Sequence, residues 1–378
     1  MTDWRPRALL AVLLLAGLLA PAQARKGRID ASEALRAAPA PQRRGLEFIL
    51  ENMPRRDREG LSTEFLLENV ALAYEALDQA PWGKTIPEDI FLNEILPYAA
   101  LSERRDDWRK TLREKCLPLV KDSKTPSEAA HRLNQTLFDL VKVRYSTQRK
   151  KPDQSPLESM ELGLASCSGL AILLVDACRS VGIPARLAGT PNWIDHAGNH
   201  TWVEIWDQGW RFAGAAEPSP EGLDHAWFVP MAAQALKDVP EHAIYAASFK
   251  KTGLAFPLNW VKGENPVSAV NVTDRYRAAA APAALDRTRL LVDVRERGTR
   301  VAARVLVDDA GPPPLRLEGT AKDGRSDTND ILAFELPRER TYDLTIEYKG
   351  KILRRRYRSV GERDRLELEL PESAPLAR

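Results

Sequence analysis

The spacing of apolar residues divides the chain into a helical part and a strand-rich part. Over residues 41–142 the apolar positions recur at helical intervals, as at Leu66, Val70 and Leu77. This period is that of a helix with one buried face. Beyond residue 287 apolar and polar side chains alternate, which is typical of strands with one face on a core. The pattern therefore predicts helices early in the chain and a small antiparallel β-sandwich of about seven strands at its end.

The middle of the chain predicts one buried helix followed by three strands. The helix extends from about Ser166 to Val181, is apolar on nearly all sides, and is ended by Gly182 and Pro184. A short capped helix is expected before it, beginning with Ser155-Pro-Leu-Glu158. Strands are expected at 185–190, 200–207 and 210–217, with Gln208-Gly209 as a two-residue hairpin turn, and a helix with loops at about 230–275.

These elements predict an α+β protein with three structured parts. A helical N-terminal region at 25–124 precedes an α+β core with an antiparallel sheet at 125–275. An Ala- and Pro-rich linker at 276–286 separates this core from an all-β sandwich at 287–378. The chain is long enough to bury one large core or two to three smaller ones.

The first 24 residues have the pattern of a secretory signal peptide. Arg5 and Arg7 precede an uncharged apolar run at 8–20, and Ala22-Gln23-Ala24 offers small residues for cleavage. We expect the chain to be exported, to the periplasm or to the outside of the cell. No second long apolar stretch follows, so no membrane insertion is expected after cleavage. The alternative is that the segment is kept as an N-terminal anchor.

The overall charge argues against a polyanionic partner. The sequence contains 55 basic and 53 acidic side chains, which gives a formal net charge of +2. A protein without a strong positive field does not attract nucleic acid over a distance. We therefore expect no nucleic-acid partner. The partner that we expect is a protein or peptide substrate, and no cofactor is expected.

The cysteine content excludes a disulfide framework, because only three cysteines occur. Cys167 and Cys178 would lie on one helix, separated by roughly 16 Å along its axis. A disulfide needs about 6 Å between Cα atoms, so a continuous helix forbids this pair. A bridge between Cys116 and Cys178 stays open at this point.

Cys167 stands where a loop enters the predicted buried helix. Unpaired backbone N–H groups and the helix dipole favour a thiolate at that end of a helix. The N–H of Cys167 is suited to stabilise an oxyanion, and the small Ser168 and Gly169 leave room for a substrate carbonyl. These features favour Cys167 as a nucleophile over a further buried structural cysteine.

His200 is the histidine best placed to act as the base for that nucleophile. Among the five histidines it alone opens a predicted strand, on the same face as Trp202 and Glu204. With a two-residue turn at Gln208-Gly209, His200 would lie opposite Glu217 on the next strand. Glu217 would then reach Nδ1 and stabilise the imidazolium, provided that the register holds.

Two other patterns could suggest metal sites. His196, His200 and Glu204 follow one another at intervals of four, which would place them together on a helix. The run at 201–206 favours a strand instead, where this spacing does not converge. The acidic segment at 323–330 lacks the spacing of a calcium loop and is expected to be a solvated loop. We therefore expect no metal ion.

Four short motifs stand between residues 125 and 235, about a third of the chain. They are Gly163-x-x-x-Cys167-x-Gly169, Gly182-Ile-Pro-Ala-Arg186, Asn199-His-Thr-Trp-Val-Glu204 and Gly209-Trp210. Together they resemble the core of the transglutaminase-like superfamily. The resemblance implies a papain-like α+β core with a Cys-His-Asp triad, in which Cys167 and His200 match the first two members.

The third member departs from the family pattern. The resemblance places an Asp four residues after the strand tryptophan, where this chain has Gly214, and Glu217-Pro218 follows three residues later. The C-terminal sandwich resembles a carboxypeptidase-regulatory-like, transthyretin-type domain, which implies binding or spacing and no chemistry. The expected function is an exported cysteine acyltransferase or hydrolase that acts on amide bonds through a thioester. The alternative is a catalytically inactive binding module of the cell envelope with the same fold.

Overall fold

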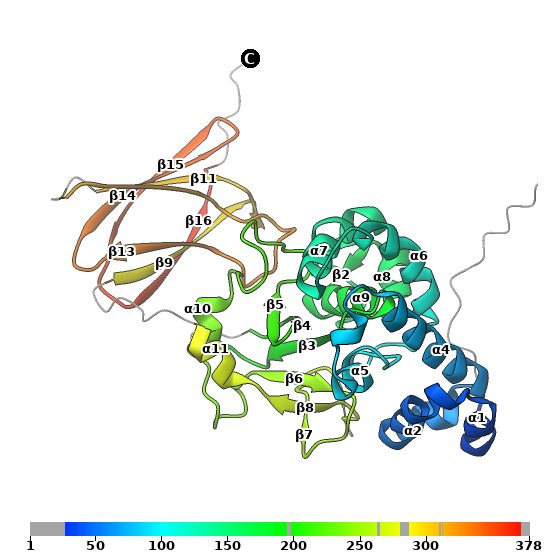
Figure 1. Cartoon of the computed structure of the whole chain (residues 1–378). Helices are drawn as coiled ribbons and strands as arrows, with labels where there is room; N and C mark the ends of the chain where they lie inside the picture. Colours follow the sequence, from blue (N-terminus) through cyan, green and yellow to red (C-terminus); the bar gives the residue numbers. More distant parts are fainter. Residues whose placement is uncertain are drawn as a thin grey trace, which may run out of the picture.

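The computed structural model describes residues 27–194, 198–262, 265–279, 287–309, 311 and 313–371 (Figure 1). The predicted signal peptide and residues 280–286 of the predicted linker lie outside these ranges. Within them, no helix has the length and apolar character needed to cross a membrane.

The N-terminal region is helical, as its apolar spacing predicts. Its longest helix is α4, which begins after Ser62, whose hydroxyl accepts a hydrogen bond from the N–H of Phe65. Buried side chains of these helices, such as Leu46 and Leu66, form a core of their own. The elements are α1 (Ala31–Ala37), η1 (Ala40–Gln42), α2 (Arg43–Asn52), α3 (Arg55–Gly60), α4 (Thr63–Gln79), η2 (Gly83–Thr85) and α5 (Glu88–Glu94).

The second core is built around one apolar helix, α9 (Cys167–Ser180). Every residue of α9 after Cys167 is buried, which confirms the expectation of a central helix. Its neighbours cover it on one side (Figure 1): α6 (Trp108–Val120), α7 (Pro126–Val141) and α8 (Pro156–Leu162). The capping box of Ser155 and Glu158 starts α8, and Gly163 ends it at φ +68°. The segments before and after α8 pair with each other as two short parallel strands, β1 (Arg144–Tyr145) and β2 (Leu164–Ala165).

The other side of α9 packs against a six-stranded antiparallel sheet of order β5-β4-β3-β6-β8-β7. Aromatic side chains, together with α10 (Val229–Ala232) and α11 (Thr273–Ala279), form a cluster at this sheet. The α+β core is therefore as expected, although the strands beyond residue 240 were not predicted. They are β3 (Ala185–Thr190), β4 (His200–Trp206), β5 (Trp210–Ala213), β6 (Tyr245–Ser248), β7 (Leu254–Ala255) and β8 (Ser268–Asn271).

The hairpin between β4 and β5 differs from the predicted one. Trp206 pairs with Trp210, so three residues form the loop, and Gln208 takes a positive φ of 55°. The N–H of Asp207 donates to the carbonyl of Gly209 inside this loop. Pairing ends at Val203 and Ala213, before it reaches His200. The two-residue turn was thus wrong, and with it the register that placed Glu217 opposite His200.

The C-terminal part consists of two four-stranded sheets that share one apolar core. One has the order β10-β9-β13 with β16 also paired to β9, and the other has the order β12-β11-β14-β15. The expected sandwich is present, but β16 runs parallel to β9, so it is not purely antiparallel. The strands are β9 (Arg287–Glu296), β10 (Thr299–Arg300), β11 (Arg304–Asp309), β12 (Leu315–Thr320), β13 (Leu332–Pro337), β14 (Thr341–Tyr348), β15 (Lys351–Arg358) and β16 (Arg363–Glu369).

One connection of the sandwich contacts the α+β core. The loop between β12 and β13, residues 321–331, crosses from one sheet to the other. The N–H of Thr328 donates to the hydroxyl of Tyr145 at 3.4 Å, and Nδ2 of Asn329 donates to the carbonyl of Asn199 at 3.1 Å. This loop therefore lies against the residue that precedes β4.

Candidate active site

Cys167 is the first residue of α9, as the sequence predicts. The hydroxyl of the preceding Ser166 accepts a hydrogen bond from the N–H of Gly169 at 3.0 Å and caps the helix. A Cβ at Gly169 would lie 3.1 Å from that of Ala165, so the tight entry to the helix favours glycine there. Cys167 is partly exposed, while Cys116 and Cys178 are buried. The helix start thus presents one accessible thiol among the three.

The two other cysteines are free thiols, so the Cys116–Cys178 bridge that the sequence left open does not form. Burial raises the pKa of Cys116 to about 12 and raises that of Cys178 as well. Both thiols therefore stay protonated and unreactive near neutral pH.

His200 opens β4 and is almost fully buried, with 2% of its surface exposed. Aromatic rings surround the imidazole, and the nearest are Trp227 at 4.7 Å and Phe228 at 5.2 Å between centroids. Trp193 and Trp202 lie slightly further away. This enclosure fixes the ring and excludes water from most of it.

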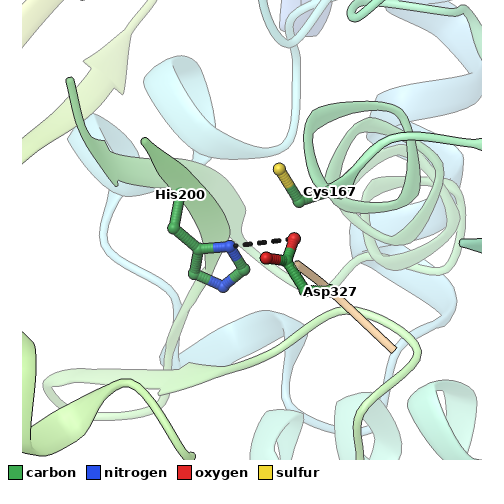
Figure 2. A group of neighbouring side chains, drawn as sticks. All are labelled: Cys167, His200 and Asp327. Atoms are coloured by element: carbon green, nitrogen blue, oxygen red, sulfur yellow. Dashed lines mark ion pairs between the residues drawn. The ribbon is translucent and has the colours of Figure 1, made fainter. Parts of the chain in front are cut away.

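The carboxylate beside His200 belongs to Asp327, in the 321–331 loop of the sandwich. Its Oδ2 lies 3.5 Å from Nδ1 of His200, and Figure 2 shows both side chains next to the thiol of Cys167. One ligand atom of each of these three residues lies within 4.8 Å of the other two. The backbone N–H and Nδ2 of Asn329 both donate to Oδ1 of Asp327, at 2.8 and 3.0 Å. One carboxylate oxygen is thus held by the loop, and the other faces the imidazole.

His200 and Asp327 stabilise each other's charged forms. Burial alone would lower the pKa of His200, but Asp327 and Cys167 outweigh it and raise that pKa well above its ordinary value. Burial would likewise raise the pKa of Asp327, yet His200 and the hydrogen bonds from Asn329 lower it. An imidazolium facing a carboxylate is therefore the favoured state of the pair.

Glu217, the predicted third member, lies near the group but makes a different contact. Its carboxylate accepts a hydrogen bond from Nε1 of Trp227 at 2.7 Å. A Cβ on Gly214, the family position, would meet Oε2 of Glu217 at 2.6 Å, so this carboxylate fills the space that a side chain there would need. Burial raises the pKa of Glu217 to about 7, while His200 acts in the opposite direction. Asp327 is therefore the carboxylate next to Nδ1 of His200, while Glu217 is hydrogen-bonded to Trp227.

Two members of the pattern at 196, 200 and 204, His200 and Glu204, lie on a strand rather than on the helix that a metal site would need. His196 lies outside the described residues, and Glu204 is on a strand. Its fully buried carboxylate accepts from Nε of Arg186 at 2.8 Å and also pairs with Arg275. Among the described residues, the group whose geometry could hold a metal ion is Cys167, His200 and Asp327 itself.

The thiol opens into a cavity of about 220 Å³ between the core and the sandwich loop. Tyr145, Asn199, Trp260 and Thr328 are among its lining residues. A wider cavity of about 880 Å³ also includes Tyr145 in its lining, together with Trp227 and Glu217. The loop that holds Asp327 contributes residues to both cavities, so both lie between this loop and the α+β core.

The fold and the site together define an α+β protein with a Cys-His-Asp group in which a helix start supplies the thiol and a strand start the imidazole. Residues 113–215 match the family model of the transglutaminase-like superfamily. The matched segment includes both Cys167 and His200. The family match thus covers residues 113–215 of the α+β core, and Asp327 lies outside the matched segment.

Two solved structures show a more distant similarity. A candidate cysteine protease from Cytophaga hutchinsonii is 17% identical, with a TM-score of 0.28 over 49% of this chain and 64% of that one. Red sea bream transglutaminase is 10% identical, with a TM-score of 0.34 over 74% of this chain and 66% of that one. This chain spans slightly less than two thirds of either protein, and these values add nothing to the family match. No curated protein matches the chain.

Proposed function

We propose that this chain is an exported cysteine enzyme that acts on amide bonds through a thioester. The observation that carries the proposal is the grouping of a partly exposed thiol, an imidazole and a carboxylate within 4.8 Å, beside a cavity. Export rests on the sequence pattern of residues 1–24. The transglutaminase-like domain supports the reaction class, because its motifs carry both Cys167 and His200.

In the first half of the reaction the thiolate of Cys167 attacks the carbonyl carbon of the amide. The carbonyl π electrons move to oxygen, and the N–H of Cys167 at the start of α9 stabilises the resulting oxyanion. As the oxyanion collapses, the C–N bond breaks and the imidazolium of His200 gives its proton to the leaving amine. A thioester on Cys167 and a neutral imidazole remain.

In the second half a nucleophile attacks the thioester carbonyl while His200 removes its proton, and the C–S bond breaks to release the thiolate of Cys167. Water yields a carboxylic acid, and an amine yields a new amide, so the same site serves a peptidase, an amidase or a crosslinking enzyme. We favour hydrolysis, since water is always present. The Asp327 carboxylate stabilises the imidazolium in both halves, and Glu217 holds the Trp227 ring against His200.

The substrate we propose is a protein or peptide chain. The 880 Å³ cavity has room for several residues and shares Tyr145 with the smaller cavity at the thiol. Its lining mixes acidic and basic side chains, among them Glu217 and Lys322, which suits a polypeptide rather than a polyanion.

Thiol labelling separates this enzyme from an inactive binding module with the same fold. The full chain is treated with iodoacetamide at pH 6–7, and the labelled peptides are identified by mass spectrometry. An activated thiol reacts at position 167 faster than free cysteine does, and Cys167→Ala removes the labelling. Ordinary reactivity at position 167 would mean a binding module. Profiling with peptide and glutamine-donor substrates then distinguishes hydrolysis from crosslinking.

A further inference from the structure

The loop that supplies Asp327 is fixed from the sandwich side by one guanidinium. Arg300 of β10 donates from Nη1 to the carbonyl oxygen of Asp327 at 3.0 Å, and from Nη2 to that of Asp330. The same guanidinium faces the buried carboxylate of Asp293 on β9, with 3.4 Å between Nε and Oδ1. Because Asp293 lies inside a strand, Arg300 ties the backbone of the loop to the rigid sheet of the sandwich.

The loop is fixed from the core side by Asn329. Its Nδ2 donates both to Oδ1 of Asp327 and to the backbone carbonyl of Asn199, the residue before His200. Gly198 lets this contact form, because a Cβ there would lie 2.6 Å from Oδ1 of Asn329. Asn329 therefore joins the carboxylate and the start of β4 through a single amide group.

The transglutaminase-like segment itself places no carboxylate at the imidazole nitrogen Nδ1. The family position is Gly214, and the carboxylate of Glu217 is engaged by Trp227. Of the described carboxylates, the one within 4 Å of His200 is that of Asp327, which belongs to the sandwich. The position of the sandwich loop thus decides whether the imidazole has a carboxylate partner.

We propose that the active site is completed across the domain boundary, so that the sandwich is part of the catalytic machinery and Arg300 and Asn329 are the residues that position Asp327. This proposal rests on the proposed function of Cys167 and His200. Docking of the 321–331 loop on Tyr145 and Asn199 brings the carboxylate of Asp327 to the imidazole beside the thiol, and release of the loop leaves the imidazole without its carboxylate. The sandwich is then a condition for activity rather than a spacer.

The test measures how fast iodoacetamide alkylates Cys167 in the full chain between pH 5 and pH 9. We expect Arg300→Ala and Asn329→Ala to slow alkylation at pH 6 by about three- to tenfold, the effect of losing one positioning hydrogen bond. At pH 9, where the thiolate forms without help from the imidazolium, both variants should react like the wild type. Arg300→Lys keeps the charge and one donor and should recover part of the rate at pH 6.

Arg356→Ala is the matched control, because Arg356 lies on β15 of the same sandwich and pairs with the exposed Asp343. It should leave the pH profile unchanged. Thermal unfolding shows whether Arg300→Ala still folds. Asn329→Ala removes no buried charge, so it tests the positioning of Asp327 independently of Arg300→Ala.

The two proposals fail in different ways. If Asp327→Asn changes the profile while folded Arg300→Ala and Asn329→Ala do not, the loop needs no positioning and the present inference is overturned. If the wild-type thiol reacts as an ordinary thiol at pH 6, the proposed function fails first. A loss at every pH in both variants, including pH 9, would mean general structural damage and would also overturn the positioning role.

Discussion

Oδ2 of Asp327 lies 3.5 Å from Nδ1 of His200, although Asp327 is on a loop between β12 and β13 and His200 opens β4, more than a hundred residues earlier. The carboxylate enters from the sandwich, and the imidazole from the sheet of the transglutaminase-like core. The second carboxylate nearby, that of Glu217, contacts the imidazole's neighbour Trp227 instead. Asp327 therefore faces the imidazole, whereas Glu217 holds a neighbouring ring. Replacing each carboxylate in turn measures how much each contact contributes.

Replacing the two carboxylates should have unequal effects on turnover. Asp327→Asn removes the charge that faces the imidazolium, and we expect amide turnover to fall by about 10²- to 10⁴-fold, as for the third member of other triads. Glu217→Gln keeps an acceptor for Trp227, so we expect a loss below about tenfold. Turnover of a peptide substrate found by profiling is measured in both variants at saturating concentration. The opposite order would assign the triad role to Glu217, as the sequence first suggested.

The imidazole itself should titrate at a higher pH than a free histidine. Asp327 and Cys167 together raise its pKa well above the usual value, against the effect of burial. Because a carboxylate stabilises the charged form, Asp327→Asn should move the titration to lower pH, and Cys167→Ala should move it the same way by less. The measurement is the NMR titration of the imidazole resonance that disappears in His200→Gln. A titration that is unchanged in Asp327→Asn would contradict the pairing.

Local signals in the sequence are enough to find Cys167 and His200, the nucleophile and the base that we propose. Ser166 caps α9 and Gly182 follows its end, so Cys167 had to lie at a helix start. His200 opens a strand whose apolar residues define its length. Both placements depend on residues that are close by in the sequence, and hydrophobic periodicity and capping motifs depend on the same nearby residues.

The third residue depends on contacts that the sequence does not display. The expected register placed Glu217 opposite His200, but the three-residue loop around Gln208 ends the β4–β5 pairing early. Asp327 belongs to an acidic, turn-rich segment that is typical of a solvated loop. What distinguishes this segment is its contact with His200 and Asn199, which are far away in the sequence, and no local pattern encodes that contact. The short strands β6 to β8 were missed for a similar reason, because two to four residues carry little period.

Glu204 should be important for stability rather than for chemistry. Its buried carboxylate pairs with Arg186 and Arg275 and accepts from the hydroxyl of Tyr276. Glu204→Ala leaves the buried positive charge of Arg186 without one of its carboxylate partners. We therefore expect the free energy of unfolding to fall by about 3–5 kcal/mol. Urea unfolding measures it. The matched control is Glu318→Ala, which removes the exposed partner of Arg304 and should leave the free energy of unfolding nearly unchanged. Equal losses in both variants would contradict the stabilising role of burial at this pair.

Glu94 should make the protein less stable as the pH rises through neutrality. Burial raises its pKa from 4.5 to about 7, although Arg186 and Arg179 act against the rise. The carboxyl is almost fully buried, and its Oε2 lacks a hydrogen-bond partner among the described residues. A raised carboxyl pKa means that the folded protein keeps a proton which the unfolded chain releases. Stability is therefore full below about pH 4.5 and falls as the pH rises through 7.

Glu94→Gln imitates the protonated carboxyl and should remove this pH dependence. The variant should gain on the wild type from pH 5 to pH 8.5 by up to about 3 kcal/mol, because the raised pKa of Glu94 penalises its ionisation in the folded protein by about that much. Urea unfolding at a series of pH values measures the difference. Glu59→Gln is the control, because Arg55 lowers the pKa of that exposed carboxyl and keeps it ionised across the whole range. Its difference from the wild type should stay constant with pH. A constant difference for Glu94→Gln as well would show that Glu94 is already ionised at pH 5 in the folded protein.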